Sequence, residues 1–125
     1  MNLLEKSEIP ASCTVTVIAG PKFEYPQEAV DALKKSVESG GKVLFLLDPP
    51  FNVDKFKVAE NKALLEMLSG WGVTLNKDVV VDLSRVGRMM GGAVLANKYE
   101  SHPVVREMGS QTVVMGFARS LEAKS

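Results

Sequence analysis

"KVLFLLDPP", residues 42–50, decides the fold, because an unbroken apolar run ends there in an aspartate and two prolines. Residues 43–47 show no alternation of apolar and polar side chains, which is typical of a strand covered on both faces of a parallel sheet. We therefore predict a central strand over residues 42–47 that ends at Asp48.

The sequence before this run predicts one strand and one helix. "TVTVIA", residues 14–19, is β-branched and apolar, and Gly20 and Pro21 close it. Pro26 suits a first helical turn, and apolar residues then recur at helical spacing until a pair of glycines at 40–41. These signals predict a strand over 14–19 and a helix from 26 to 39.

The sequence after the run continues the same rhythm. An apolar face at helical spacing predicts a helix over 58–70, and "DVVVD", residues 78–82, predicts the next strand. Strands that alternate with helices indicate parallel pairing and right-handed crossovers. We predict a single α/β domain over residues 1–125, with a doubly wound, mostly parallel sheet and helices on both faces.

The last third of the chain is less clearly patterned. Residues 83–100 receive no firm assignment, and 93–96 fit either a short edge strand or part of a long loop. Residues 103–108 predict one or two helical turns, and the alternation in 111–118 predicts a last strand.

Composition excludes several classes of function. Fifteen basic residues balance fifteen acidic ones, so we expect no nucleic-acid partner. The longest apolar run, 43–47, is far too short to span a membrane, and the chain as given is predicted to be soluble. One cysteine and one histidine cannot complete a zinc site, and we predict no metal and no cofactor.

The candidate site lies at the carboxyl ends of the predicted strands, where ligands bind in open parallel sheets. Three groups meet this criterion: Gly20 with Pro21, Asp48 with Pro49, and Asp82. Two carboxylates on one rim could bind a divalent cation or act as acid and base. An aspartate that ends a strand more often caps a turn, and we favour that interpretation.

Neither candidate for nucleophilic catalysis has a suitable setting. Cys13 precedes a strand, without the tight turn or basic partner that activates a thiol. His102 is followed by a proline, and the sequence offers it no partner beyond the remote cysteine. We predict no catalytic residue and keep His102 as a ligand- or partner-contact residue. Scattered arginines at 85, 88, 106 and 119 could gather around an anion, but surface ion pairing is the commoner arrangement.

Five ordered strings carry a resemblance to a known family: "EIPASCTVTVIAGP", "AVDALKKSVESGGKVLFLLDPP", "LLEMLSGWGVTLNKDVVVD", "YESHPVVREM" and "VVMGFARSLE". Their order resembles the auxiliary component of ABC transport systems associated with gliding motility. The resemblance implies an extracytoplasmic, periplasmic domain of a membrane-anchored parent protein, which serves a transporter without hydrolysing nucleotide. It also implies a fold similar to class I glutamine amidotransferases, without their catalytic cysteine.

Members of that family carry a further strand and helix before the "IP" motif, so we expect this chain to begin within the domain. A domain without its first βα unit exposes a sheet edge, and we expect self-association there. The leading hypothesis is a noncatalytic accessory or ligand-sensing domain that contacts the membrane or ATPase subunits of an ABC transporter. The alternative is a module, amidotransferase-like or flavodoxin-like, that binds a small anion or metal between Asp48 and Asp82. A receiver-like signalling domain is disfavoured, because the expected acids and lysine are missing at the strand ends.

Overall fold

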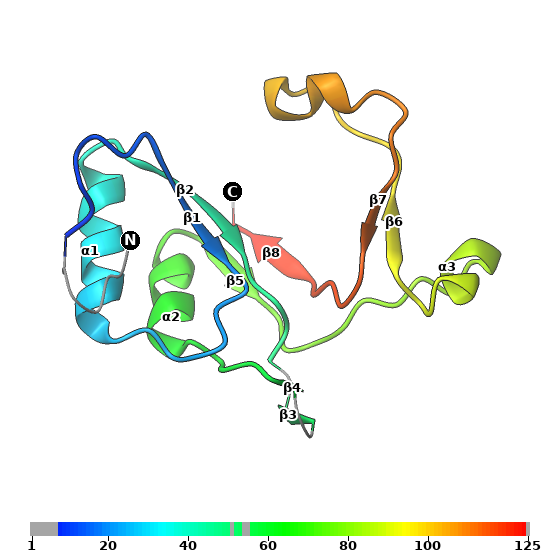
Figure 1. Ribbon diagram of the computed structural model, residues 1–125, viewed down its shortest axis with the longest axis horizontal. Coiled ribbons are helices and arrows are strands. Elements are labelled where there is room, and N and C mark those ends of the chain that lie inside the picture. Colours follow the sequence, from blue (N-terminus) through cyan, green and yellow to red (C-terminus); the bar gives the residue numbers. More distant parts are fainter. Residues whose placement is uncertain (1–7, 51, 54–55, 125) are drawn as a thin grey trace. The chain divides into compact units, whose positions relative to one another are not determined.

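The computed structural model describes residues 8–50, 52–53 and 56–124 (Figure 1). The chain divides into two compact units, and each is described by itself. Unit 1 comprises Met1–Lys77 and Leu121–Ser125, and unit 2 comprises Asp78–Ser120. Within the described ranges, no helix is both long and apolar enough to cross a lipid bilayer.

Unit 1 is built around one parallel pair of strands. β1 (Val15–Ala19) runs parallel to β2 (Lys42–Leu46), with Val17 opposite Leu44. The connection between them holds α1 (Gln27–Glu38), which begins after Pro26 as the sequence predicts. α2 (Lys62–Gly70) follows β2 and packs beside α1 (Figure 1). The predicted order of strand, helix and strand is therefore confirmed, and the helix predicted over residues 58–70 begins at Lys62. Two short strands that the sequence did not predict precede this helix.

Three short antiparallel pairs complete the described strands. β3 (Asn52–Val53) pairs with β4 (Phe56–Lys57). β5 (Val73–Leu75) pairs in unit 1 with β8 (Leu121–Ala123). In unit 2, β6 (Val94–Ala96) pairs with β7 (Val113–Met115), and α3 (Arg85–Met89) and the 3₁₀ helix η1 (Pro103–Met108) complete the unit.

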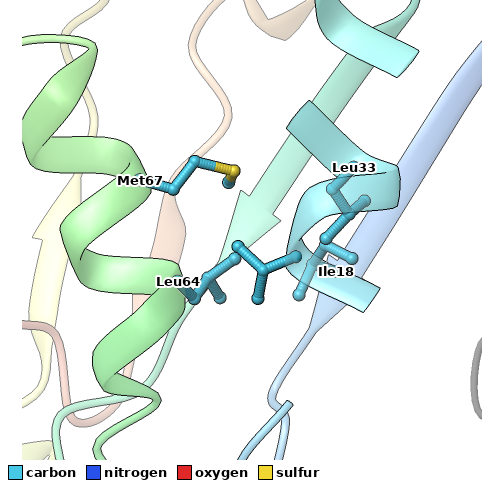
Figure 2. Close-up of a cluster of buried hydrophobic side chains, with 5 residues drawn as sticks. Ile18, Leu33, Leu64 and Met67 are labelled. Atoms are coloured by element: carbon cyan, nitrogen blue, oxygen red, sulfur yellow. The ribbon is translucent and has the colours of Figure 1, made fainter. Parts of the chain in front are cut away.

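The hydrophobic core of unit 1 lies between the parallel pair and its two helices. Ile18 from β1, Leu33 from α1, and Leu64 and Met67 from α2 meet in one cluster (Figure 2). Leu33 and Leu64 are completely buried. Full burial of a leucine side chain contributes about 1.5–3 kcal/mol, so this cluster holds the helices against the sheet.

The opposite face of the parallel pair is exposed in the part of unit 1 that the structure describes. Val15, Val17, Leu44 and Leu46 all lie on this face, and Val17 and Leu44 are 54% and 49% exposed. Exposure alternates along both strands, because side chains of a strand point alternately to its two faces. The prediction that residues 42–47 form a central strand covered on both faces is therefore wrong.

The prediction of a doubly wound, mostly parallel sheet, whether flavodoxin-like or amidotransferase-like, is also wrong. The described residues form four two-stranded sheets, and three of the four are antiparallel. Residues 78–82 are not a strand; Val80 donates one backbone bond to Ala118 and Asp82 one to Gly92. Isolated bonds do not make a ladder, so this segment cannot extend a parallel sheet.

Unit 2 is poor in buried side chains. Of residues 78–120, all of which the structure describes, only Gly87 is buried. The uncertain assignment of residues 93–96 is resolved in favour of a strand, and the helical turns at 103–108 are confirmed. A strand within 111–118 is confirmed too, but it is not the last one, because β8 follows it. α3 was not predicted, because it is five residues long and contains a glycine.

Candidate functional site

The carboxyl ends of β1 and β2 bring two predicted site residues together. The N–H group of Gly20 donates to the carbonyl of Leu46 at 2.8 Å. A side chain on Gly20 would place its Cβ 3.2 Å from Oδ2 of Asp48, and the backbone there has a φ of +50°. Glycine adopts such a φ without steric cost, so this residue lets the loop pass close to the carboxylate.

The two prolines of the candidate site support this rim. Pro49 is fully buried and Pro21 is half-buried, whereas Asp48 is exposed. Since the strands are parallel neighbours, both loops leave the same edge of the sheet. This is the edge at which the sequence placed a ligand- or partner-contact site, and that role stays a prediction.

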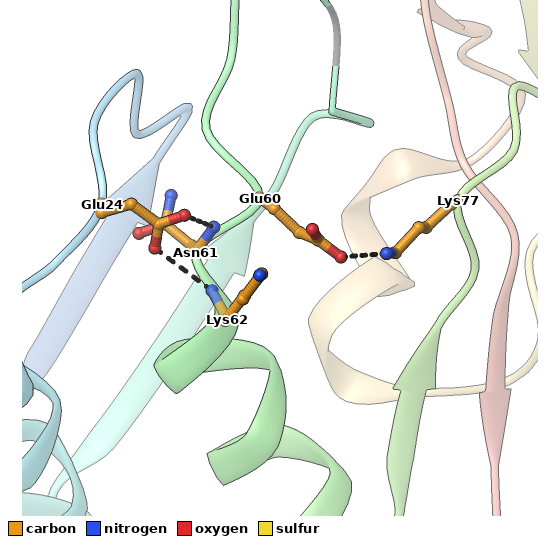
Figure 3. A network of polar contacts seen from close by, with 5 residues as sticks. All are labelled: Glu24, Glu60, Asn61, Lys62 and Lys77. Carbon is orange, nitrogen blue, oxygen red and sulfur yellow. Dashed lines mark hydrogen bonds and ion pairs between the residues drawn. The ribbon is translucent and has the colours of Figure 1, made fainter.

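The loop after β1 is joined to the start of α2 by a carboxylate that the sequence analysis did not single out (Figure 3). Oε1 of Glu24 accepts the N–H of Asn61 at 3.0 Å, and Oε2 accepts the N–H of Lys62 at 3.2 Å. The first N–H groups of a helix have no partner inside it, and a negative charge there is favourable. Glu24 therefore caps α2 from a distant loop.

Asn61 completes the same network in a left-handed conformation. It is 5% exposed, has a φ of 53°, and accepts the N–H of Tyr25 at its Oδ1 at 2.9 Å. Asparagine tolerates this conformation better than most residues. Because the Asn61 side chain accepts from Tyr25 and does not cap the helix, the first N–H groups of α2 are bound by Glu24. In the sequence, an asparagine just before an apolar helical pattern is a signal for a helix start, and Asn61 could have been found by it.

One ion pair lies beside this network. The ammonium group of Lys77 contacts the carboxylate of Glu60 (Figure 3). Lys77 is mostly exposed, so the pair contributes little to stability.

Asp82, the third predicted rim residue, belongs to unit 2 and closes a turn there. Its Oδ1 accepts the N–H of Ser84 at 2.8 Å, and the Ser84 hydroxyl accepts the N–H of Gly87 at 3.1 Å. The backbone hydrogen bond from Ser84, followed by the bond from its hydroxyl, lowers the pKa of the Asp82 carboxyl. The structure thus gives Asp82 a turn-capping contact; the predicted meeting of Asp48 and Asp82 stays a prediction.

His102 and Cys13 also lie in different units. Nδ1 of His102 accepts the N–H of Val104 at 3.2 Å, at the start of η1. Cys13 is exposed, and its N–H donates to the carbonyl of Pro10 at 2.9 Å. With Lys35, Cys13 lines a pocket of about 250 Å³ beside α1. Among the described residues, no three His, Cys, Asp or Glu side chains form a group that could hold a metal ion.

The described residues form a mixed α/β fold in which carboxylates accept hydrogen bonds from the backbone of loops and helix ends. This fold is similar to that of the mmIFT52 N-terminal domain, with a TM-score of 0.65 and 21% sequence identity. That match covers 89% of this chain and 48% of the solved chain, so this chain spans about half the length of that structure. No curated protein matches the sequence.

The sequence model of a family described as ABC-type uncharacterized transport system matches residues 1–124. The chain belongs to this family of auxiliary components of ABC-type transport. The predicted resemblance to auxiliary components of ABC-type transport is confirmed at the level of the family.

Proposed function

We propose that the chain is a noncatalytic accessory domain of a bacterial ABC transport assembly, in the branch associated with gliding motility, and that it acts by binding proteins. The family match over residues 1–124 carries this proposal. The uses of the carboxylates support it. Glu24 caps α2, Asp78 binds Ser120 and Asp82 closes a turn. The bonds to Asp78 and Asp82 lower the pKa of both carboxyls, so these two groups are poor proton donors near neutral pH.

The apolar surface of unit 2 supports a role in protein binding. Leu83, Met89 and Phe117 are 70%, 78% and 68% exposed. Large apolar side chains that stay exposed in a unit with almost no buried residues are available for contact with a protein partner. We propose that these three side chains take part in one such contact. Methionine adapts its shape to a partner. We assign this surface, here the 83/89/117 surface, to a membrane or ATPase subunit of the transporter.

The proposed compartment is extracytoplasmic, as a periplasmic domain of a membrane-anchored parent protein. Alkaline phosphatase, which is active only outside the cytoplasm, should be active when fused after Ser125 in the parent protein. A fusion that is inactive although it is expressed would contradict this location.

The rim residues Gly20, Pro21, Asp48 and Pro49, together with Asp82 and His102, remain proposed ligand- or partner-contact residues. A catalytic or metal-binding role makes a different prediction from an accessory one. For the accessory role, Mg²⁺ or Ca²⁺ should leave the melting temperature of the chain unchanged, because a ligand must bind the native state to stabilise it. Stabilisation by either ion that Asp48→Asn abolishes would favour the metal-binding alternative.

The decisive experiment is co-purification of the parent protein with its transport subunits from its native cells. Leu83→Ser with Met89→Ser should reduce the recovered ABC subunits at least several-fold. Phe23→Ser, which removes a side chain of unit 1 that is 82% exposed, is the matched control and should leave recovery unchanged. Equal recovery with both variants would contradict a role for the 83/89/117 surface. A parent protein that recovers no ABC subunit would contradict the accessory function itself.

A further inference from the structure

The connection between β6 and β7 forms a pocket that, apart from His102, the proposed function does not use. Its volume is about 320 Å³, and its lining includes Tyr99, Glu100, Ser101, His102, Arg106 and Gly109. All of these residues lie in unit 2. The volume is sufficient for a small organic molecule, and most of the lining side chains are polar.

Tyr99 holds the two ends of this connection together. Its hydroxyl lies 2.9 Å from the carbonyl of Ala96 and 3.1 Å from the carbonyl of Gln111, and donates its proton to these oxygens. Ala96 ends β6, and Gln111 lies just before β7. A single hydroxyl therefore fastens the entrance and the exit of the loop that carries the pocket.

His102 offers the pocket a hydrogen-bond donor. Its Nδ1 accepts the N–H of Val104, so this nitrogen carries no proton. A neutral imidazole whose Nδ1 is an acceptor has its proton on Nε2. The backbone contact thus determines the tautomer and makes Nε2 the donor.

Arg106 adds a positive charge to the same lining. Of the described residues, none forms an ion pair with its guanidinium, and Glu100, which also lines the pocket, does not pair with it either. A guanidinium presents five N–H donors in a planar fork that matches the two oxygens of a carboxylate. Since the charge is not used within the structure, it is available to a ligand.

We propose that this pocket binds a small carboxylate. Its two oxygens are held by the guanidinium of Arg106, with Nε2 of His102 and the hydroxyl of Ser101 as further donors. Glu100 favours a carboxylate over phosphate, because its negative charge repels a doubly charged phosphate more strongly than a singly charged carboxylate. This site is independent of the proposed transport role.

The test is a titration of the ¹⁵N-labelled full chain, followed by amide chemical shifts at constant ionic strength. Propionate is the probe, propionamide is its neutral counterpart, and phosphate is the competing oxyanion. Propionate should give saturable shifts centred on residues 99–109, propionamide should give none, and phosphate should bind more weakly. Arg106→Gln should weaken propionate binding by about tenfold or more, the usual loss for a charge-assisted bond.

Three further variants sharpen the result. Lys98→Gln removes a nearby positive charge outside the lining and should change the affinity less than about twofold, as expected of a screened surface charge. Arg106→Lys keeps the charge without the planar fork, so it should bind propionate more weakly than the original chain and more tightly than Arg106→Gln. This variant still tests the role of the guanidinium if Arg106→Gln does not fold. Glu100→Gln should strengthen phosphate binding more than propionate binding.

The proposal is wrong if propionate shifts do not saturate or if propionamide reproduces them. It is also wrong if Lys98→Gln weakens binding as much as Arg106→Gln, since the attraction would then be unspecific. Phosphate binding as tight as propionate binding would overturn the assignment to carboxylates.

Discussion

The carboxylate of Asp78 accepts two hydrogen bonds from Ser120, one from its backbone N–H at 2.9 Å and one from its hydroxyl at 2.6 Å. These two residues are the first and the last of unit 2. The pair therefore joins the two chain segments at the point where they enter and leave the unit. The hydroxyl bond, then the backbone bond, lowers the pKa of the Asp78 carboxyl, because both bonds favour its charged form.

Unit 2 should loosen in acid. The pKa of Asp78 is lower in the folded chain than in the unfolded chain, so the unfolded chain binds more protons as the pH falls. The stabilising contribution is complete above the ordinary carboxyl pKa of about 4 and is lost as the pH falls through the lower, folded value. Amide hydrogen exchange of Ser120, corrected for its intrinsic pH dependence, should accelerate in that range.

Asp78→Asn is the variant that tests the contact between Asp78 and Ser120. It keeps the shape of the side chain but removes the charge, so protection of the Ser120 amide should be weaker at neutral pH. In this variant, acid should reduce the protection of the Ser120 amide only as much as it reduces the protection of the rest of unit 2, to whose acid sensitivity Asp82 also contributes. If the variant and the original chain lose protection at the same pH, Asp78 is not the responsible group.

Glu24→Ala should destabilise unit 1 by about 1 kcal/mol, the usual cost of a lost helix cap. The N–H groups of Asn61 and Lys62 lose their acceptor, and the start of α2 loses a favourable negative charge. Urea unfolding followed by the fluorescence of Trp71, the single tryptophan, measures this change, since its ring lies 6.5 Å from that of Phe45 in unit 1. Glu66→Ala, on the exposed side of the same helix, should cost less than about 0.5 kcal/mol. Equal losses would contradict the cap.

Gly41→Ala should destabilise the turn between α1 and β2. The added Cβ would lie 2.7 Å from the backbone oxygen of Ser36, closer than atoms can approach. Overpacking of this kind costs about 1–3 kcal/mol. Gly70→Ala is the control, because a Cβ there meets nothing within 4 Å and alanine favours the helix by up to about 1 kcal/mol. Urea midpoints that shift in the same direction for both variants would contradict this steric explanation.

The exposed face of β1 and β2 should support self-association of the purified chain. Val17 lies opposite Leu44 on this face, and the net formal charge of zero offers no repulsion between copies. Light scattering coupled to size exclusion should report a mass above that of the 13.5 kDa monomer. Val17→Lys should return the chain to a monomer, whereas Phe23→Lys should not. A wild-type chain that is a monodisperse monomer would refute the expectation.

Periodicity in the sequence was sufficient where the contacts are local. Pro26 and the apolar spacing through Leu33 predict α1, because a helix bonds only within its own segment. β-branched residues predict β1, and the glycines predict the end of α1. Of the rim, the proximity of Gly20 and Asp48 followed from the expectation of parallel neighbours.

What the sequence determined by itself is therefore α1, α2, the helical turns at 103–108, the first strands and the family. Only the tertiary structure decided which strand faces are covered, and which strands pair. Leu44 is as apolar as Phe45, yet only Phe45 packs against the core, because the helices cover a single face. Leu121–Ala123 is a strand only because Val73–Leu75 lies beside it. A β-strand gains its hydrogen bonds from a neighbour that is remote in the chain, so its own residues do not specify that neighbour.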